Sequence, residues 1–104
     1  MGKDSTELEE LTRTVTAPKV KTPKLFKVIL LNDDFTPMDF VIEILKRFFN
    51  KQDAEAIEIM MQVHNKGFGV AGVYQFDIAE TKAHQVNMHS RKKEHPLKCT
   101  VEAE

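Results

Sequence analysis

The stretch from Leu30 to Phe40 reads LLNDDFTPMDF, and the rest of the chain can be interpreted around it. An apolar run that begins at Phe26 stops at three polar residues, 32–34, and a proline then precedes an amphipathic segment. Pro37 suits the first position of a helix, and Thr36 just ahead of it is a candidate N-cap. The pattern therefore predicts a strand, a polar loop and a helix in direct succession, with an amide and two carboxylates at the rim of the core.

Two helices are expected after this loop. The first begins near Pro37 and has a wide apolar stripe, which consists of Phe40, Val41, Ile44, Leu45, Phe48 and Phe49. The second covers about 54–65 and ends at Lys66-Gly67, because glycine commonly follows the last turn of a helix. Its apolar positions are Ala56, Ile57, Met60 and Met61, and His64 continues the same spacing. We therefore expect His64 at a core position.

The remaining segments predict a strand, a helix and a strand. Residues 68–76 are rich in Val, aromatic residues and glycine, with close backbone approach expected at Gly69 and Gly72. Asp77 and Glu80 have the spacing of a capping box and open a helix to about position 93. Ala79, Ala83 and Val86 give this helix a small-residue face. Pro96 stops any continuation, and residues 97–101 alternate as a last strand.

The resulting order, β-α-α-β-α-β, predicts a two-layer α+β domain. We expect a three-stranded antiparallel sheet with three helices on one face, built from residues 25–104. Residues 1–24 contain Pro18 and Pro23, many Thr and Lys, and only scattered apolar side chains. Such a composition cannot bury enough surface to order itself, so we expect a flexible N-terminal extension.

Composition excludes several classes of protein. With 41% hydrophobic and 30% charged residues, the chain has the balance of a globular protein. Its net charge of −1 argues against nucleic acid as the main partner. Apolar runs are too short to span a membrane, and the acidic N-terminus lacks the apolar core of a signal peptide, so we expect a cytoplasmic protein. The single cysteine, Cys99, excludes an internal disulfide and is expected to be a buried structural thiol.

The polar loop could bind an amine. Asn32, Asp33 and Asp34, joined by His64 if the second helix packs beside the loop, would supply acceptors for a primary ammonium, which has three donors and no acceptor. Neighbouring residues could line an apolar cavity, namely Met38, Val41, Met60, Val63 and Leu97. Together these groups would fit a hydrophobic amino acid at the N-terminus of a polypeptide.

Two other interpretations stay open at this level. Asn-Asp-Asp before Phe-Thr-Pro also suits a turn that satisfies its own hydrogen bonds, and a methionine stripe at helical spacing is often core. A small metal-dependent hydrolase using Asp33, Asp34 and His64 is the enzymatic alternative. The chain lacks the His-Glu-x-x-His, phosphate-loop and nucleophile motifs of known enzyme classes. We therefore expect a protein that is not an enzyme and needs no cofactor or metal.

Several motifs together resemble the ClpS family, the N-end-rule adaptors of the ClpAP protease. The resemblance covers about residues 25–104 and keeps its motifs in order. These are Leu31-Asn32-Asp33-Asp34-Phe35-Thr36-Pro37-Met38-Asp39-Phe40, Val63-His64, Gly72-Val73-Tyr74, Ala79-Glu80-Thr81-Lys82, His95-Pro96-Leu97 and Cys99-Thr100.

The resemblance implies an adaptor that binds N-degron polypeptides beginning with Leu, Phe, Tyr or Trp. It would deliver them to the ClpA unfoldase for degradation by ClpP. The substrate α-amino group would be held by Asn32, Asp33 and His64. The hydrophobic pocket would consist of Thr36, Met38, Val41, Met60, Val63 and Leu97, with Met38 as a gate against β-branched residues.

The same resemblance implies a docking surface for the N-terminal domain of ClpA that includes Phe35, Asp77 and Lys82. Phe35 stands where the family usually has Tyr, and Asp77 where it usually has Glu. Residues 1–24 match the arm that hands the substrate over. The alternative within this fold is a docking or regulatory domain on a Clp unfoldase that does not recognise N-degrons.

Overall fold

The computed structural model of the protein describes residues 23–104, and the extension expected at residues 1–24 lies almost entirely outside them. The elements follow the order β-α-α-β-α-β, as the sequence predicts. They are β1 (Leu25–Leu31), α2 (Met38–Phe49), α3 (Asp53–Lys66), β2 (Phe68–Gln75), α4 (Phe76–Lys92) and β3 (Lys98–Ala103).

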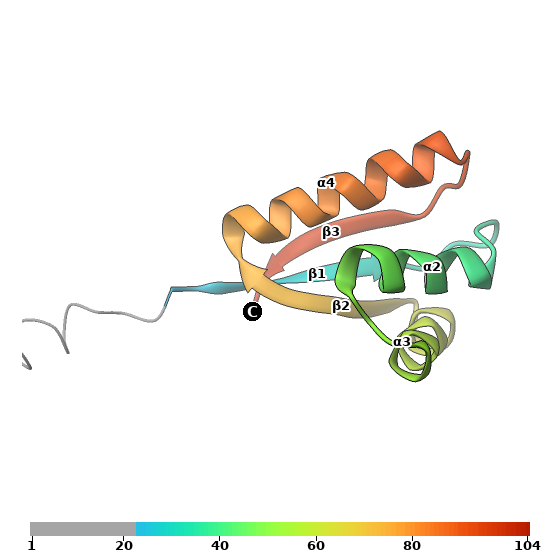
Figure 1. Ribbon diagram of the computed structural model, residues 1–104, viewed down its shortest axis with the longest axis horizontal. Coiled ribbons are helices and arrows are strands. Elements are labelled where there is room, and N and C mark those ends of the chain that lie inside the picture. Colours follow the sequence, from blue (N-terminus) through green and yellow to red (C-terminus); the bar gives the residue numbers. More distant parts are fainter. Residues whose placement is uncertain (1–22) are drawn as a thin grey trace, which may run out of the picture.

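The three strands form one antiparallel sheet in the order β2-β1-β3 (Figure 1). Leu31, at the end of β1, pairs with Phe68 on one side and Lys98 on the other. At the opposite end of the sheet Leu25 pairs with Gln75, and the Glu104 amide donates to the Leu25 carbonyl at 3.0 Å. The loop between β1 and α2 therefore lies at the end of the sheet far from the C-terminus.

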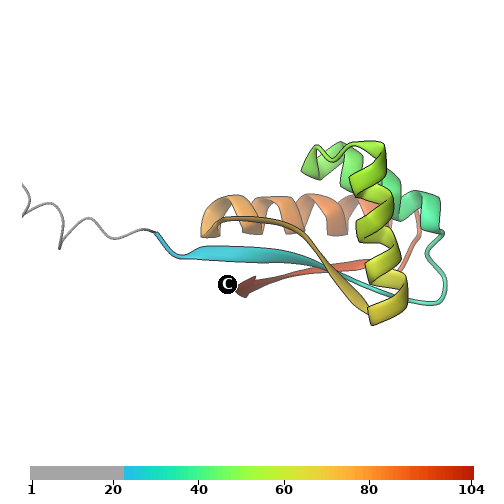
Figure 2. The same ribbon diagram turned by 90° about the horizontal axis from the view of Figure 1, so that it is seen from below.

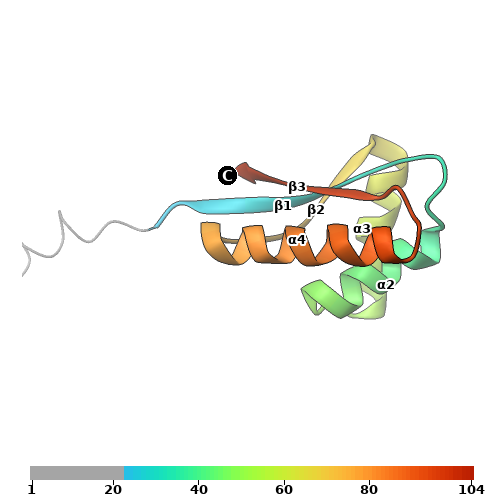
Figure 3. The same ribbon diagram turned by 90° about the horizontal axis from the view of Figure 1, so that it is seen from above.

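All three helices cover the same face of the sheet (Figures 2 and 3). Val28 and Leu30 of β1 are fully buried under them, as are Ile44 and Leu45 of α2. The small-residue face predicted for α4 is confirmed and buried; it consists of Ala79, Ala83 and Val86. Small side chains on this face allow α4 to lie close to β1 and β3. The predicted two-layer α+β fold is confirmed.

The stripe predicted for α3 is wrong in part. Ala56 and Met60 are buried as expected, but Ile57 and Met61 are 47% and 41% exposed, and His64 is exposed too. The buried stripe consists of Ala56, Ile59, Met60 and Val63. Apolar residues lie on both sides of Met60 in this helix, so the sequence pattern allows two overlapping faces. Contact with β2 and α2 decides which face is buried.

Both predicted helix caps are also wrong. Pro37 itself is the N-cap of α2, without a side-chain hydrogen bond, and the Thr36 hydroxyl bonds Asp33 instead. Helix α4 begins at Phe76 with Gln75 as its N-cap, so Asp77 lies inside the first turn. There its carboxylate accepts a hydrogen bond from the neighbouring Ile78 amide at 2.9 Å, and no capping box forms.

Two glycines fix how α3 joins β2. Gly67 ends the helix with φ of 91°, a left-handed conformation that favours glycine. Two residues later, a Cβ on Gly69 would lie 2.7 Å from Val63 Cγ2 and 3.3 Å from the Ile59 carbonyl oxygen. The close approach predicted at Gly69 is therefore confirmed, and it allows α3 to pack against its own following strand.

The helices within residues 23–104 include none with both the length and the apolar character needed to cross a bilayer.

Candidate functional site

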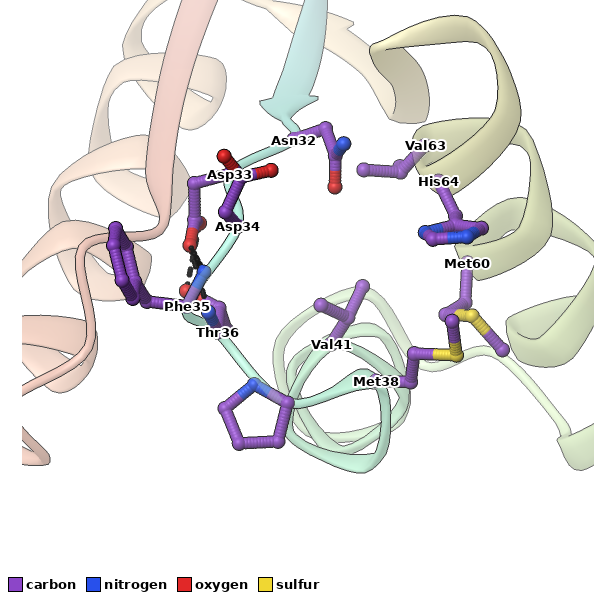
Figure 4. Close-up of a pocket in the computed structure, with 11 residues that line it drawn as sticks. Asn32, Asp33, Asp34, Phe35, Thr36, Met38, Val41, Met60, Val63 and His64 are labelled. Carbon is purple, nitrogen blue, oxygen red and sulfur yellow. Dashed lines mark hydrogen bonds between the residues drawn. The ribbon is translucent and has the colours of Figure 1, made fainter.

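A cavity of about 360 Å³ opens between the β1–α2 loop, the start of α2 and the second half of α3 (Figure 4). The loop supplies its polar wall and the two helices supply most of its apolar wall. The residues that line it are Asn32, Asp33, Asp34, Phe35, Thr36, Pro37, Met38, Val41, Met60, Val63 and His64. The structure thus brings the sequence motif of residues 32–38 together with the Val63-His64 pair.

One backbone hydrogen bond connects the two walls. The Asn32 amide donates to the Gly67 carbonyl at 2.9 Å, which ties the start of the loop to the end of α3. His64 lies one turn earlier in the same helix, and its ring comes to the cavity from the side opposite Asp33 and Thr36 (Figure 4). Figure 4 shows the Asn32 side-chain amide and the His64 ring both directed toward the open space.

Asp33 holds the loop in shape. Its Oδ1 accepts hydrogen bonds from the amides of Phe35 at 2.8 Å and Thr36 at 2.7 Å, and its Oδ2 accepts one from the Thr36 hydroxyl at 2.7 Å. Partial burial alone would raise the pKa of Asp33. The hydrogen bonds from Thr36 and Phe35, aided by the charge of His95, outweigh that effect and lower the pKa below 3.8. Asp33 is therefore a carboxylate at neutral pH.

A carboxylate has about four acceptor positions, and the loop uses three of those on Asp33. One position, on Oδ2, is not used by the loop. The side-chain oxygen of Asn32 and an unprotonated nitrogen of His64 can add two more acceptors. The polar wall can therefore accept hydrogen bonds from a primary ammonium group, and it carries a negative charge that attracts one.

The apolar wall is rigid at its base and open at its rim. Val41, Met60 and Val63 are 6%, 7% and 2% exposed, so they are held by the core while their remaining surface faces the cavity. Met38 is 45% exposed at the first position of α2, where its flexible side chain can adapt to what enters. This wall suits a large apolar side chain, aliphatic or aromatic.

Leu97 is not on the cavity wall. It is 3% exposed and belongs to the main core cluster, one residue before β3 begins. Of the six residues proposed for the hydrophobic pocket, the other five line the cavity. The sequence pattern correctly indicated that Leu97 is buried, but it could not tell core from cavity wall.

The three residues expected on a docking surface are not neighbours. Phe35 is 80% exposed in the loop after Leu31. Asp77 follows Gln75, which pairs with Leu25 at the other end of the sheet. Lys82, on α4, donates to the Phe48 carbonyl at 2.8 Å and lies 5.3 Å from the centre of the Tyr74 ring.

Sequence reasoning missed the cavity contacts of Phe35 and Pro37, although both fall within the motif. Asp34, named in the sequence analysis among the candidate acceptors for an ammonium, does line the cavity. Among residues 23–104, however, the side-chain hydrogen bonds that shape this loop end on Asp33, and none ends on Asp34. No group of three or more His, Cys, Asp or Glu side chains in that part of the chain is placed to hold a metal ion.

Comparisons with known proteins agree on one family. Residues 21–100 match the family model described as ATP-dependent Clp protease adaptor protein ClpS. An ATP-dependent Clp protease adapter protein ClpS from Alkalilimnicola ehrlichii is 58% identical over 84 residues, which is 81% of this chain and 79% of the relative. A protein of the same name from Shewanella halifaxensis is 53% identical over 95 residues, covering 91% of this chain and 92% of the relative.

A solved structure is also similar. It is Agrobacterium tumefaciens ClpS2 bound to L-phenylalaninamide, with a TM-score of 0.77 and 42% sequence identity. The match covers 80% of this chain and 100% of the other.

Proposed function

The chain belongs to the ClpS family of ATP-dependent Clp protease adaptor proteins, and we propose that it is an N-degron adaptor. In this proposal it binds polypeptides whose first residue is Leu, Phe, Tyr or Trp. It then delivers them to the ClpA unfoldase for degradation by ClpP. The protein acts by binding, and the peptide bond is cut elsewhere.

The observation that carries the proposal is the composition of the cavity. Acceptors for an ammonium group and a rigid apolar wall meet in one space of about 360 Å³. Only the first residue of a polypeptide has both a free ammonium and a side chain on the same carbon. L-Phenylalaninamide, the ligand named for the similar ClpS2 structure, has this chemistry: a free α-amine, a benzyl group and an amide in place of the first peptide bond.

Each wall has a proposed role. Asn32, His64 and the remaining acceptor position of Asp33 hold the α-amino group. Side chains of Thr36, Met38, Val41, Met60 and Val63 surround the first side chain, and Leu97 supports them from the core. Met38 at the rim narrows the entrance and disfavours Ile and Val, which branch next to the main chain.

The expected affinity is moderate. Burial of a Leu or Phe side chain contributes roughly 1.5–3 kcal/mol. Two or three hydrogen bonds to a charged group add about 1.5–3 kcal/mol each. After the cost of association, a dissociation constant in the micromolar range or somewhat lower follows. Such an adaptor releases its cargo readily when another protein takes it.

For delivery, we propose that residues 25–104 form the adaptor core and that residues 1–24 take part in handing the substrate to ClpA. Phe35, Asp77 and Lys82 are the proposed contacts with the N-terminal domain of ClpA. Because these residues lie toward both ends of the sheet, the contact would run along the domain for about the length of β1, roughly 20 Å for a seven-residue strand.

The experiment that tests the proposal is fluorescence anisotropy of labelled peptides that differ only in the first residue. Peptides beginning with Leu, Phe, Tyr and Trp should bind, and those beginning with Ile or Ala should bind far more weakly. Delivery is measured by adding ClpA, ClpP and ATP and following degradation of a folded reporter with N-terminal Phe. If none of these peptides binds, the N-degron proposal is wrong, and the alternative function as a docking domain on a Clp unfoldase is favoured.

A further inference from the structure

Helix α3 has two overlapping apolar faces. Successive residues of a helix are about 100° apart, so Ala56, Ile59, Met60 and Val63 fall within one arc of about 100°. This is the face buried in the core. Ile57, Met60, Met61 and His64 fall within a second arc of the same width, rotated from the first by about 100°. Met60 belongs to both arcs.

The second arc continues the cavity wall onto the surface. Met60 and His64 line the cavity. Around the helix Met61 lies beyond His64 and Ile57, about 100° from Met60, and Ile57 lies about one turn nearer the start of α3. Ile57 and Met61 are 47% and 41% exposed, whereas Met60 is 7% exposed. An apolar strip therefore leaves the cavity at Met60 and spreads over Ile57 and Met61.

Toward the start of α3, the strip ends at a carboxylate whose charge is balanced by a lysine. Asp53, in the first turn of α3, forms an ion pair with Lys46 of α2 at 2.6 Å. Between this pair and the cavity the second arc presents only Ile57, Met60, Met61 and His64. A side chain lying along it would meet apolar surface rather than a carboxylate.

The geometry of an extended chain says which residue of a bound polypeptide reaches the strip. Successive side chains of an extended chain point to opposite sides, and residues one and three point to the same side, about 6.6 Å apart. With the first side chain in the cavity, the second points away from the protein and the third points toward its surface. The strip begins beside the cavity, and Met61 and Ile57 are about one helical turn, 5.4 Å, apart along α3.

We propose that Met61 and Ile57 form a subsite for an apolar side chain at the third position of the bound polypeptide. This inference rests on the proposed function, because the first residue must occupy the cavity for the third to reach α3. It adds a second determinant of substrate choice beyond the first residue. Polypeptides with Leu, Ile, Met or Phe at the third position are favoured cargo.

The test uses two labelled peptides of identical composition, Phe-Gly-Leu-Gly and Phe-Leu-Gly-Gly, each extended by the same polar tail, and a third with Ser in place of the third-position Leu. Fluorescence anisotropy measures each dissociation constant. Removal of a few tens of Å² of apolar surface from water gives about a three- to tenfold effect. Phe-Gly-Leu-Gly should therefore bind about three- to tenfold tighter than both other peptides.

Variants locate the effect. The double substitution Met61→Ser with Ile57→Ser should equalise the three affinities and leave the affinity for the Ser peptide unchanged. Met88→Ser is the matched control, because Met88 is 54% exposed on α4 and does not line the cavity. It should keep the wild-type preference.

Equal binding of all three peptides to the wild-type protein would overturn the subsite while leaving first-residue recognition intact. A preference that survives the double substitution would overturn it as well, since the apolar contact would then lie elsewhere. If no peptide with N-terminal Phe binds, the proposed function itself fails, and the subsite fails with it.

Discussion

Thr36 donates two hydrogen bonds to Asp33, one from its amide to Oδ1 and one from its hydroxyl to Oδ2, each at 2.7 Å. The pair closes the loop between β1 and α2 on itself. These hydrogen bonds hold the backbone between Asn32 and Met38, which line different sides of the cavity. Asp33 is thus first an organiser of the loop, and its proposed contact with a ligand would use only the acceptor position left over.

Substitution Thr36→Val should loosen this loop. It keeps the shape of the side chain but removes the hydroxyl donor, so we expect a loss of about 0.5–1.5 kcal/mol in the free energy of unfolding. The affinity for a peptide with N-terminal Phe should fall several-fold. Urea unfolding and fluorescence anisotropy measure the two effects.

Thr81→Val is the control for that substitution. The Thr81 hydroxyl donates to the Asp77 carbonyl in the exposed first turns of α4, away from the cavity. This variant should bind the peptide as the wild type does. Wild-type affinity in Thr36→Val would contradict the loop-organising role of the hydroxyl.

The pH dependence of stability should identify Asp33 as a charged hydrogen-bond acceptor. Its pKa in the folded protein is lowered below 3.8 by the net effect described above. A lowered pKa means that the carboxylate stabilises the fold above the unfolded-state value, and that this contribution is lost as pH falls through the folded-state value. Asp33→Asn should therefore be destabilised relative to wild type by a constant amount from about pH 5 to 8, and the difference should shrink below 3.8.

Urea unfolding of both proteins across this range provides the measurement. A difference that stays the same down to the lowest pH at which the wild type is folded would show that charge on Asp33 contributes nothing.

The shape of the cavity should depend on the absence of a side chain at Gly69. A Cβ there would lie 2.7 Å from Val63 Cγ2, so Gly69→Ala should push α3 away from β2 and cost about 1–3 kcal/mol of unfolding free energy. Because Val63 lines the cavity, peptide affinity should fall too.

Gly67→Ala separates this effect from backbone strain. Gly67 has φ of 91°, and a Cβ added there would have no atom within 4 Å, so alanine should cost about 1 kcal/mol and leave affinity unchanged. Equal losses of affinity in both variants would contradict a specific role for the Gly69–Val63 contact.

Cys99 should be an unreactive thiol. It is 4% exposed, and burial raises its pKa to about 12, so almost none is thiolate at pH 8. Its backbone is held as well, because Asn87 accepts from the Cys99 amide at 2.9 Å and donates to its carbonyl at 3.0 Å. Labelling with a thiol reagent should be orders of magnitude slower in the native protein than in urea. Comparable rates would show that β3 opens readily.

Much of the fold could be predicted from the sequence because most of its elements have one clear apolar face. Ala79, Ala83 and Val86 allow only one face of α4 to pack, and the alternation of Val28 and Leu30 with Lys27 defines the covered face of β1. Helix α3 lacks this clarity. Ile57 and Met61 are as apolar as Ile59 and Val63, and only the contacts made by β2 and α2 select the buried face.

The candidate site divides in the same way. The loop motif and Val63-His64 were predicted to lie together, and they do. The hydrogen-bond partner of the Thr36 hydroxyl was harder to predict. This hydroxyl could cap α2 or bond Asp33, and the turn geometry of the loop favours Asp33. Leu97 shows a further limit of prediction from sequence. An apolar residue that lines a cavity and one buried in the core behind it have the same sequence pattern.

Amine recognition can be tested with two labelled peptides of identical sequence beginning with Phe, one with a free N-terminus and one acetylated. Acetylation removes the charge and two of the three donors that Asn32, Asp33 and His64 are proposed to bind, and it adds bulk where these acceptors converge. Fluorescence anisotropy should give a micromolar or lower dissociation constant for the free peptide. The dissociation constant of the acetylated peptide should be at least about a hundredfold higher. Equal affinity for the two peptides would contradict N-degron recognition at this cavity.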